Sequence, residues 1–306
     1  MISFVIPCYK SALTIGQVVA EIKETIIEEA YEIILVNDAS PDNTFDVVRE
    51  LCSADSNIIG VNLNENFGQH AALMAGFHQV RGDIVVCLDD DGQTPAREAG
   101  KLIEAIRQGH DAVYARYARK RHSGFRNFGS HLNELMARFL LEKPKELYLS
   151  SYFAAKRFII DEMIKYDNPY PYVIGLLLRS TKDIVNVDVC HREREVGQSG
   201  YTLSKLFKLW LNGFTAFSVK PLRVATATGF FVAFAGFVYG IVTIIRKLTG
   251  LNYVLGFSGL MSVLLLIGGL NLIMLGLIGE YIGRIYISMN KSPQFIVREI
   301  VNDRKK

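Results

Sequence analysis

Residues 84–93 read IVVCLDDDGQ, an apolar run that ends in three consecutive carboxylates, Asp89, Asp90 and Asp91. A continuous apolar and β-branched run predicts a strand that is buried on both faces within a parallel sheet. Ligands of open α/β sheets bind just beyond the ends of such strands, and crowded carboxylates favour hard cations such as Mg²⁺ or Mn²⁺. An acidic loop on a solvated surface is the alternative, but the position at a strand end favours a metal site.

The segments around this stretch alternate between strand-like and helix-like patterns. Strands are predicted over residues 2–6, 32–37, 58–62, 83–88 and 111–115, and helices over residues 13–30, 45–54, 69–80 and 96–108. This β-α-β-α order predicts an α/β fold with a mostly parallel, doubly wound sheet and right-handed crossovers.

Two later segments, residues 224–245 and 259–279, are largely apolar and contain no charged residue. Each exceeds the roughly 18–20 residues that cross a bilayer core, and both contain the glycines that membrane helices tolerate. A buried core helix of this length would normally carry a polar stripe. The sequence therefore predicts two transmembrane helices.

The charges that flank these segments predict their topology. Several basic residues precede residue 224 and follow residue 283, whereas the connecting segment contains only Arg246 and Lys247. Because cytoplasmic flanks carry the excess of lysine and arginine, we expect the N-terminal domain and the C-terminal tail to be cytoplasmic. The start of the chain, MISFVIPCYK, lacks the basic and long apolar regions of a signal peptide.

Residues 203–219 combine one apolar and one basic helical face, which suits a helix at the membrane interface with Trp210 at headgroup depth. An ordinary core-facing helix is the alternative. We therefore expect four parts: a cytoplasmic domain over residues 1–200, interfacial amphipathic helices over 201–223, a transmembrane hairpin over 224–283 and a cytoplasmic tail over 284–306.

The overall composition excludes some classes of function. A net charge of +3 is too small to indicate nucleic-acid binding, and an anionic membrane surface accounts for the basic excess. The four cysteines lie far apart and form no CxxC pair, which is typical of a reducing compartment and argues against a zinc site.

Two other predicted strands end in polar residues at the same sheet edge as the carboxylates. The first ends in Pro7-Cys8-Tyr9, and the second ends in Asn37-Asp38. An Asp at a strand end can accept a hydrogen bond from a nucleobase or ribose, whereas the alternative for Asp38 is an Asx-turn or a helix N-cap. Three polar strand ends at one edge favour the binding role.

Together these motifs resemble the polyprenyl-phosphate glycosyltransferases, which are GT-A-fold enzymes of glycosyltransferase family 2. The resemblance rests on VIPCYK, EIILVNDASPDNT, NFGQHAALMAGFHQVRGDIVVCLDDDGQTP, HREREVGQSGYT and GEYIGRIY, and it spans nearly the whole chain. Relatives of this kind include dolichol-phosphate mannose synthase and bactoprenol glucosyltransferase. The segment NFGQHAALMAGF is most similar to the undecaprenyl-phosphate formamido-arabinose transferases.

The resemblance implies inverting transfer of a sugar from a nucleotide-sugar, preferably UDP-linked, to undecaprenyl phosphate. The enzyme would be a multi-pass protein of the bacterial inner membrane, with its catalytic domain in the cytoplasm. By position, Asp89, Asp91 and Arg194 would be catalytic. Asp89, Asp91 and Gln93 would hold Mg²⁺ or Mn²⁺ on the diphosphate.

The resemblance also implies two sets of binding residues. The nucleotide-sugar would contact Pro7, Tyr9, Asp38, Asp89 and Asp90, although Asp90 occupies the variable middle of the DxD pattern and is not assigned as a metal ligand. Arginine suits an anionic acceptor because its planar fork binds phosphate bidentately. The acceptor-phosphate site would comprise Arg116, Arg126, Ser130, Arg194, Ser199 and Tyr201.

The chain departs from the family pattern at two places. Ser151 stands where some relatives have Asp, which raises the question of a catalytic base. A lipid phosphate is already anionic at neutral pH, so such a base is dispensable for this acceptor. Lys10-Ser11 stands where many relatives have Asn-Glu, which could alter the contacts to the nucleotide.

Two alternatives remain at this point. A polysaccharide synthase of the same family would need more membrane spans and a QxxRW-like motif, which the chain lacks. A catalytically silent membrane scaffold or lipid-phosphate-binding protein would have no reason to combine these polar residues. Small residues such as Gly229 and Gly236 could pack helices in a homo-oligomer. The role of His70, at the start of a predicted helix near the site, stays open.

Overall fold

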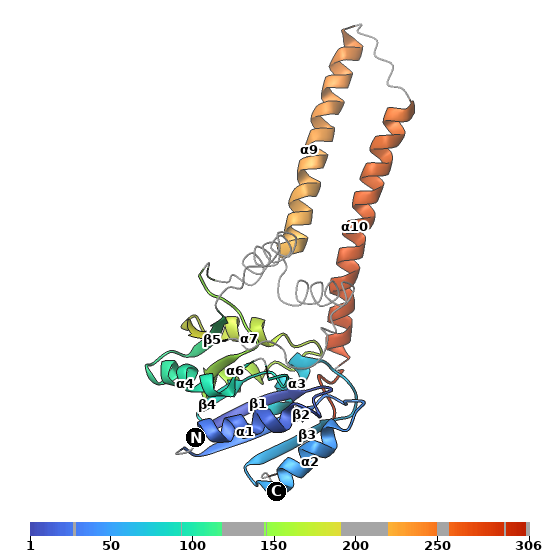
Figure 1. Ribbon diagram of the computed structural model, residues 1–306. Coiled ribbons are helices and arrows are strands. Elements are labelled where there is room, and N and C mark those ends of the chain that lie inside the picture. The colour runs from blue at the N-terminus through green and yellow to red at the C-terminus, as the bar shows by residue number, and fades with distance from the viewer. Residues whose placement is uncertain are drawn as a thin grey trace. The chain divides into compact units, whose positions relative to one another are not determined.

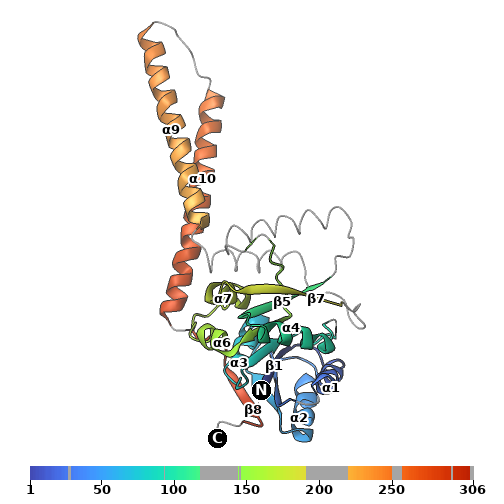
Figure 2. The same ribbon diagram turned by 90° about the vertical axis from the view of Figure 1, so that its left-hand side faces the viewer.

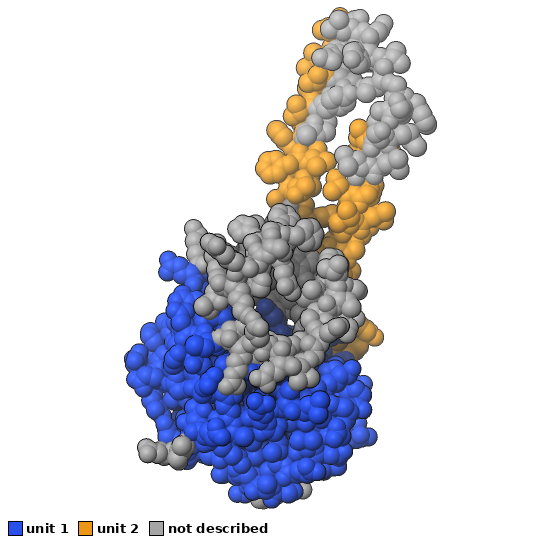
Figure 3. Space-filling view, viewed as in Figure 1, with its two compact units in different colours: residues 1–203, 291–306 blue, residues 204–290 orange. Residues whose placement is uncertain are grey.

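The computed structural model describes residues 1–26, 29–92, 94–117, 144, 146–190, 220–249, 257–290 and 292–303. The chain divides into two compact units, one of Met1–Leu203 with Lys291–Lys306 and one of Ser204–Asn290 (Figure 3). The first unit contains the sheet, and the second contains two long helices.

The described residues of the first unit form one mixed sheet, whose strands are β1 (Ile2–Cys8), β2 (Tyr31–Asn37), β3 (Ile58–Leu63), β4 (Ile84–Cys87), β5 (Ala112–Tyr117), β6 (Phe153–Lys156), β7 (Ile184–Val189) and β8 (Val297–Val301). The eight strands follow the order β7-β5-β6-β4-β1-β2-β3-β8 (Figure 1). Strands β4, β1, β2 and β3 are mutually parallel, whereas β6 and β8 are antiparallel to their neighbours. The α/β fold with a mostly parallel centre is therefore confirmed.

Helices cover both faces of this sheet, and they are α1 (Ile15–Thr25), α2 (Thr44–Ala54), α3 (Gln69–Phe77), the 3₁₀ helix η1 (Ala96–Glu98), α4 (Ala99–Arg107), α6 (Arg157–Met163) and α7 (Val173–Ser180). Helices α1, α2 and α4 share one core with the sheet, and α3, α6 and α7 lie on the other face (Figure 2). The elements that the sequence predicts between residues 2 and 117 are thus present, with α1 and α3 shorter than expected.

Local sequence patterns explain these elements. All seven residues of β1 are buried, as expected for a strand covered on both faces. The buried residues of α1 are Ile15, Val18, Val19 and Ile22, the i, i+3, i+4, i+7 spacing of an amphipathic helix. Helix α3 packs so closely that a Cβ on Gly76 would lie 2.5 Å from Cγ1 of Val5.

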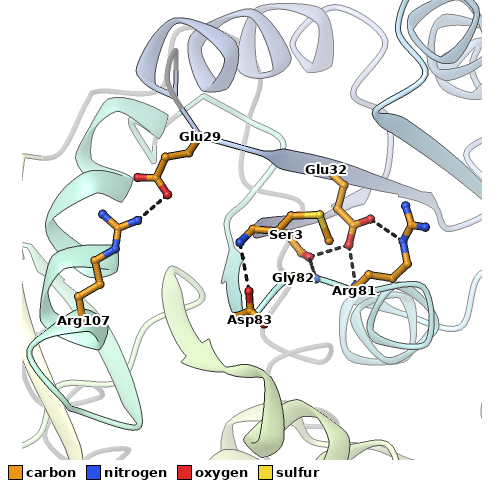
Figure 4. Close-up of polar contacts among 8 residues, drawn as sticks. Ser3, Glu29, Glu32, Arg81, Gly82, Asp83 and Arg107 are labelled. Carbon is orange, nitrogen blue, oxygen red and sulfur yellow. Dashed lines mark hydrogen bonds and ion pairs between the residues drawn. The ribbon is translucent and has the colours of Figure 1, made fainter.

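The buried carboxylate of Glu32 holds the N-terminal ends of the central strands together, at the end of the sheet opposite Asp89, Asp90 and Asp91 (Figure 4). Glu32 Oε1 accepts hydrogen bonds from Ser3 Oγ and from the backbone N–H of Arg81, each at 2.6 Å. The Arg81 guanidinium lies 3.3 Å from Glu32 Oε2, and Ser3 Oγ accepts a hydrogen bond from the N–H of Gly82 at 2.8 Å. These bonds hold the turn before β4 against β1 and β2.

The C-terminal segment differs from the expectation of a cytoplasmic tail over residues 284–306. Helix α10 continues to Met289, and β8 then pairs antiparallel with β3. Side chains fix this strand: the amide of Asn302 donates to the carbonyls of Cys52 at 2.7 Å and Ile58 at 2.8 Å. Part of the predicted tail is therefore an edge strand of the sheet.

The second unit contains α9 (Lys220–Leu248) and α10 (Phe257–Met289). These helices include both predicted apolar segments and lie side by side in both views (Figures 1 and 2). Large apolar side chains along them are exposed, such as Phe231 and Leu272. Within the part of the chain that the structure describes, only Ile267–Met289 is long and apolar enough to count as a membrane span. The two transmembrane helices therefore stay a prediction.

Candidate active site

The three carboxylates follow β4 at the point where the sheet topology reverses. From β1 the chain continues to β2 and β3 on one side, whereas β4 pairs with β1 on the other side. In open α/β sheets the crevice outside the carboxyl ends of two such strands is the usual ligand site. The topology therefore places the ends of β1 and β4 at the expected position of an active site.

Asp90 joins these two strand ends. Its Oδ2 accepts a hydrogen bond from the backbone N–H of Tyr9 at 2.9 Å. The next two N–H groups also have side-chain acceptors, because Lys10 donates to Ser40 Oγ at 2.9 Å and Ser11 donates to Thr44 Oγ1 at 3.0 Å. Asp90 thus positions the turn after β1 against the end of β4, and its exclusion from the metal ligands stays a prediction.

Asp89 is held by two donors that the sequence analysis did not assign to the site. Its Oδ1 accepts from Gln69 Nε2 at 2.9 Å, and its Oδ2 accepts from Ser151 Oγ at 2.5 Å. Burial raises the pKa of Asp89 to about 6, with smaller contributions from the charges of Asp91 and Asp90. A nearby cation would therefore stabilise the charged form of this carboxylate.

Asp89 and Asp91 fit a hard divalent cation, because they offer only oxygen ligands and because the charge of Asp91 raises the pKa of Asp89. The third predicted ligand, Gln93, lies outside the described residues. Among the residues that are described, no cluster of three or more His, Cys, Asp or Glu side chains is placed to hold a metal. A site here would therefore need ligands beyond the protein carboxylates, such as Gln93 or a diphosphate.

Asp38 is buried, with 3% of its surface exposed, and both of its carboxylate oxygens have partners. They accept hydrogen bonds from the backbone N–H groups of Phe67 and Gly68, each at 2.8 Å. Burial raises the pKa of Asp38, and these two bonds lower it in part. The carboxylate thus fixes the loop that leads into α3, a role that the sequence analysis did not foresee beside the predicted nucleobase contact.

The other predicted nucleotide contacts differ in exposure. Tyr9 is 46% exposed at the end of β1 and is open to a ligand. Pro7 is buried within β1 and therefore offers little surface to a nucleotide. Pro7 lies inside the strand whereas Tyr9 follows it, which explains their difference in exposure.

Arg116 has a partner that the sequence did not reveal. Its guanidinium forms two bonds with Asp188 of the neighbouring strand β7, at 2.6 Å and 2.9 Å. An acceptor phosphate would have to compete with this carboxylate. The remaining predicted acceptor residues lie outside the described part of the chain: Arg126, Ser130, Arg194, Ser199 and Tyr201.

Tyr117 is a further residue that sequence reasoning missed. Burial raises the pKa of its hydroxyl, the hydrogen bond with Ser150 lowers it in part, and the charges of Asp89 and Asp91 raise it further. Nothing in the local sequence distinguishes this tyrosine. Ser151 did have a signal, since it occupies the position of an acid in some relatives.

Comparison with known proteins agrees with this geometry. Residues 3–164 match the model of glycosyl transferase family 2, and residues 220–285 match the GtrB C-terminal hairpin. The chain belongs to glycosyltransferase family 2. This glycosyltransferase is 32% identical to the undecaprenyl-phosphate 4-deoxy-4-formamido-L-arabinose transferase of Proteus mirabilis, over 99% of this chain and 95% of that protein. The corresponding transferase of Photorhabdus laumondii is also 32% identical, with the same coverage.

Solved structures share the fold of the glycosyltransferase. Glucosyl-3-phosphoglycerate synthase from Mycobacterium tuberculosis, in complex with Mn²⁺, UDP-glucose and phosphoglyceric acid, superposes with a TM-score of 0.52 at 19% identity. The match covers 68% of this chain and 74% of the synthase. At this identity the similarity establishes the fold.

Proposed function

We propose that this glycosyltransferase transfers a sugar from a UDP-linked donor to undecaprenyl phosphate, with inversion at the anomeric carbon. The main support is the match at 32% identity to undecaprenyl-phosphate transferases, because it extends over 99% of the chain, including both apolar helices. A polysaccharide synthase is disfavoured by the same match and by the absence of a QxxRW-like motif.

The proposed donor site lies at the ends of β1 and β4. Asp89, Asp91 and Gln93 would hold a divalent cation, Mg²⁺ or Mn²⁺, which neutralises charge on the leaving diphosphate when bound. Gln69 and Ser151 orient Asp89 by their hydrogen bonds. The presence of Mn²⁺ with UDP-glucose in a solved protein of the same fold supports the choice of a divalent cation.

The proposed acceptor needs no protein base. Ser151, at the position of an acid in some relatives, donates a hydrogen bond to Asp89 and is therefore not placed to accept a proton from the acceptor. A phosphate nucleophile is ionised at neutral pH and brings its own charge to the anomeric carbon. Arg126, Ser130, Arg194, Ser199 and Tyr201 are proposed to bind this phosphate, together with Arg116 when Asp188 releases it.

The proposed location is the cytoplasmic face of a bacterial inner membrane. Two transmembrane helices, α9 and α10, would anchor the enzyme, and the amphipathic segment 201–223 would lie at the interface. The apolar stretch Ile267–Met289 and the match of residues 220–285 to the GtrB C-terminal hairpin support this arrangement. A homo-oligomer through the small residues of these helices is part of the same proposal.

Nucleotide binding provides the test. Full-length protein in detergent is heated with a panel of nucleotide-sugars, with Mn²⁺ or with EDTA, and the midpoint of thermal unfolding is recorded. A ligand at about 100 times its Kd stabilises the folded state by about 2.7 kcal/mol, which is readily measured. We expect stabilisation by a UDP-sugar only in the presence of the cation. Equal curves with every donor would contradict the proposed function.

A further inference from the structure

The turn that follows β1 has no backbone donors left for a ligand over residues 9–11. The N–H groups of Tyr9, Lys10 and Ser11 donate to side chains of Asp90, Ser40 and Thr44. In many nucleotide-binding α/β folds, the backbone N–H groups of this first turn bind the phosphates. This turn therefore cannot bind a diphosphate through these N–H groups without breaking its own hydrogen bonds.

Lys10 lies in this turn with a strained backbone. Its φ angle is 58°, in the left-handed region that favours glycine or asparagine over other residues. Ala39, which follows β2, has a φ angle of 47°, so both neighbouring strand ends contain such a residue. Backbone strain of this kind is concentrated at binding sites, where surrounding contacts enforce it.

Lys10 also places a positive charge at the same end of the sheet as the three carboxylates that follow β4. Among the residues that follow β1, β2 and β4, namely 9–11, 38–43 and 88–92, Lys10 has the only basic side chain. Its Nζ lies 5.6 Å from the centroid of the exposed Tyr9 ring. The ammonium is thus held beside a residue that is open to a ligand.

We propose that Lys10 binds the diphosphate of the nucleotide-sugar through its ammonium group. The inference rests on the proposed function, because it assumes a nucleotide donor at the ends of β1 and β4. In this arrangement the turn contributes a side-chain cation in place of backbone N–H groups. A single divalent cation leaves the combined charge of three carboxylates and a diphosphate negative, and Lys10 reduces that excess.

Calorimetric titration of the full-length protein in detergent tests this proposal, with UDP as the probe in the presence of Mn²⁺. A charge-assisted hydrogen bond at a partly exposed site corresponds to about a tenfold change in affinity. We therefore expect Lys10→Met to raise the Kd for UDP about tenfold, and Lys10→Arg to stay within about threefold. The control Lys165→Met removes an exposed lysine of the loop after α6 and should leave the Kd unchanged.

A fourth variant separates binding from backbone strain. Asparagine adopts positive φ more readily than lysine, so Lys10→Asn should raise the unfolding midpoint by about 2–4 °C while weakening UDP about tenfold. Unchanged UDP affinity in both Lys10→Met and Lys10→Asn, with wild-type protein that binds UDP, would overturn the role of Lys10. If wild-type protein binds neither UDP nor another nucleoside diphosphate, the proposed function itself fails.

Discussion

Replacement of Asp89 by asparagine should stabilise the metal-free protein and at the same time abolish cation-dependent donor binding. The reason is the pKa of Asp89, which burial raises from an ordinary 3.8 to about 6. In the unfolded chain this carboxyl loses its proton near pH 3.8, whereas the folded protein keeps it until about pH 6. The folded state therefore loses stability as the pH rises through this window, and the loss is complete above it.

The size of the effect follows from the two pKa values. Each pKa unit corresponds to about 1.4 kcal/mol, so the shift from 3.8 to about 6 sets an upper bound of about 3 kcal/mol. Solvent reaches part of the side chain, which reduces the penalty to about 1–2 kcal/mol. An asparagine can still accept from Gln69 and can donate to Ser151, so Asp89→Asn removes the charge but retains both contacts.

The assay is thermal unfolding of the full-length protein in detergent with EDTA at pH 7.5, followed by circular dichroism. A gain of 1–2 kcal/mol corresponds to a rise of about 2–8 °C for a domain of this size. The gain should shrink as the pH falls from about 6 to 3.8 and disappear below that range, where Asp89 is protonated in both states. The control Asp46→Asn removes an exposed carboxylate on α2 and should change little. A lower midpoint for Asp89→Asn than for wild type at pH 7.5 would refute the reasoning.

Three further predictions concern stability. Glu32→Gln should lower the free energy of unfolding in urea by about 2 kcal/mol, because the buried side chain loses its charge-assisted hydrogen bonds from Ser3 and Arg81. An unchanged free energy of unfolding would contradict the role of Glu32. Asn302→Gly should lower the free energy of unfolding by about 1–2 kcal/mol, because it removes the hydrogen bonds to β3 and α2. Asn302→Ala should lower it by about 1 kcal/mol more, because the φ angle of 58° at this position is unfavourable for alanine, and equal losses in the two variants would exclude backbone strain. Burial lowers the pKa of His70 to about 4, so the free energy of unfolding should fall as the pH drops from 6.5 to 4. His70→Gln should make this fall smaller when unfolding is measured across the pH range, and an unchanged fall would contradict the role of His70.

The parts of the fold that the sequence predicts are those with strong local patterns. The apolar runs of β1 and β4 identify central parallel strands because both faces are covered. Strand β6 spans only four residues, and β8 reads VREIV, in which two adjacent charged residues break the alternation expected of a half-buried strand. Their pairing depends on partners far along the chain, so local pattern alone does not reveal them.

The candidate site likewise contains residues that the sequence predicts and contacts that it does not. The position of Asp89 and Asp91 after a buried strand is readable from sequence, because topology alone brings strand ends together. The donors to Asp89, the Asp188 partner of Arg116 and the use of both oxygens of Asp38 depend on side-chain direction. Such contacts join segments that are distant in sequence, and only the folded arrangement determines them.

Sugar transfer to a lipid phosphate is the most direct test of the proposed activity. Purified full-length protein in detergent is incubated with Mn²⁺, undecaprenyl phosphate and each of a panel of UDP-sugars, and the lipid fraction is analysed by mass spectrometry. We predict one glycosylated undecaprenyl phosphate, which is lost on addition of EDTA and in Asp91→Asn. Intact protein that binds a UDP-sugar with Mn²⁺ but transfers no sugar to the lipid would contradict the proposed acceptor.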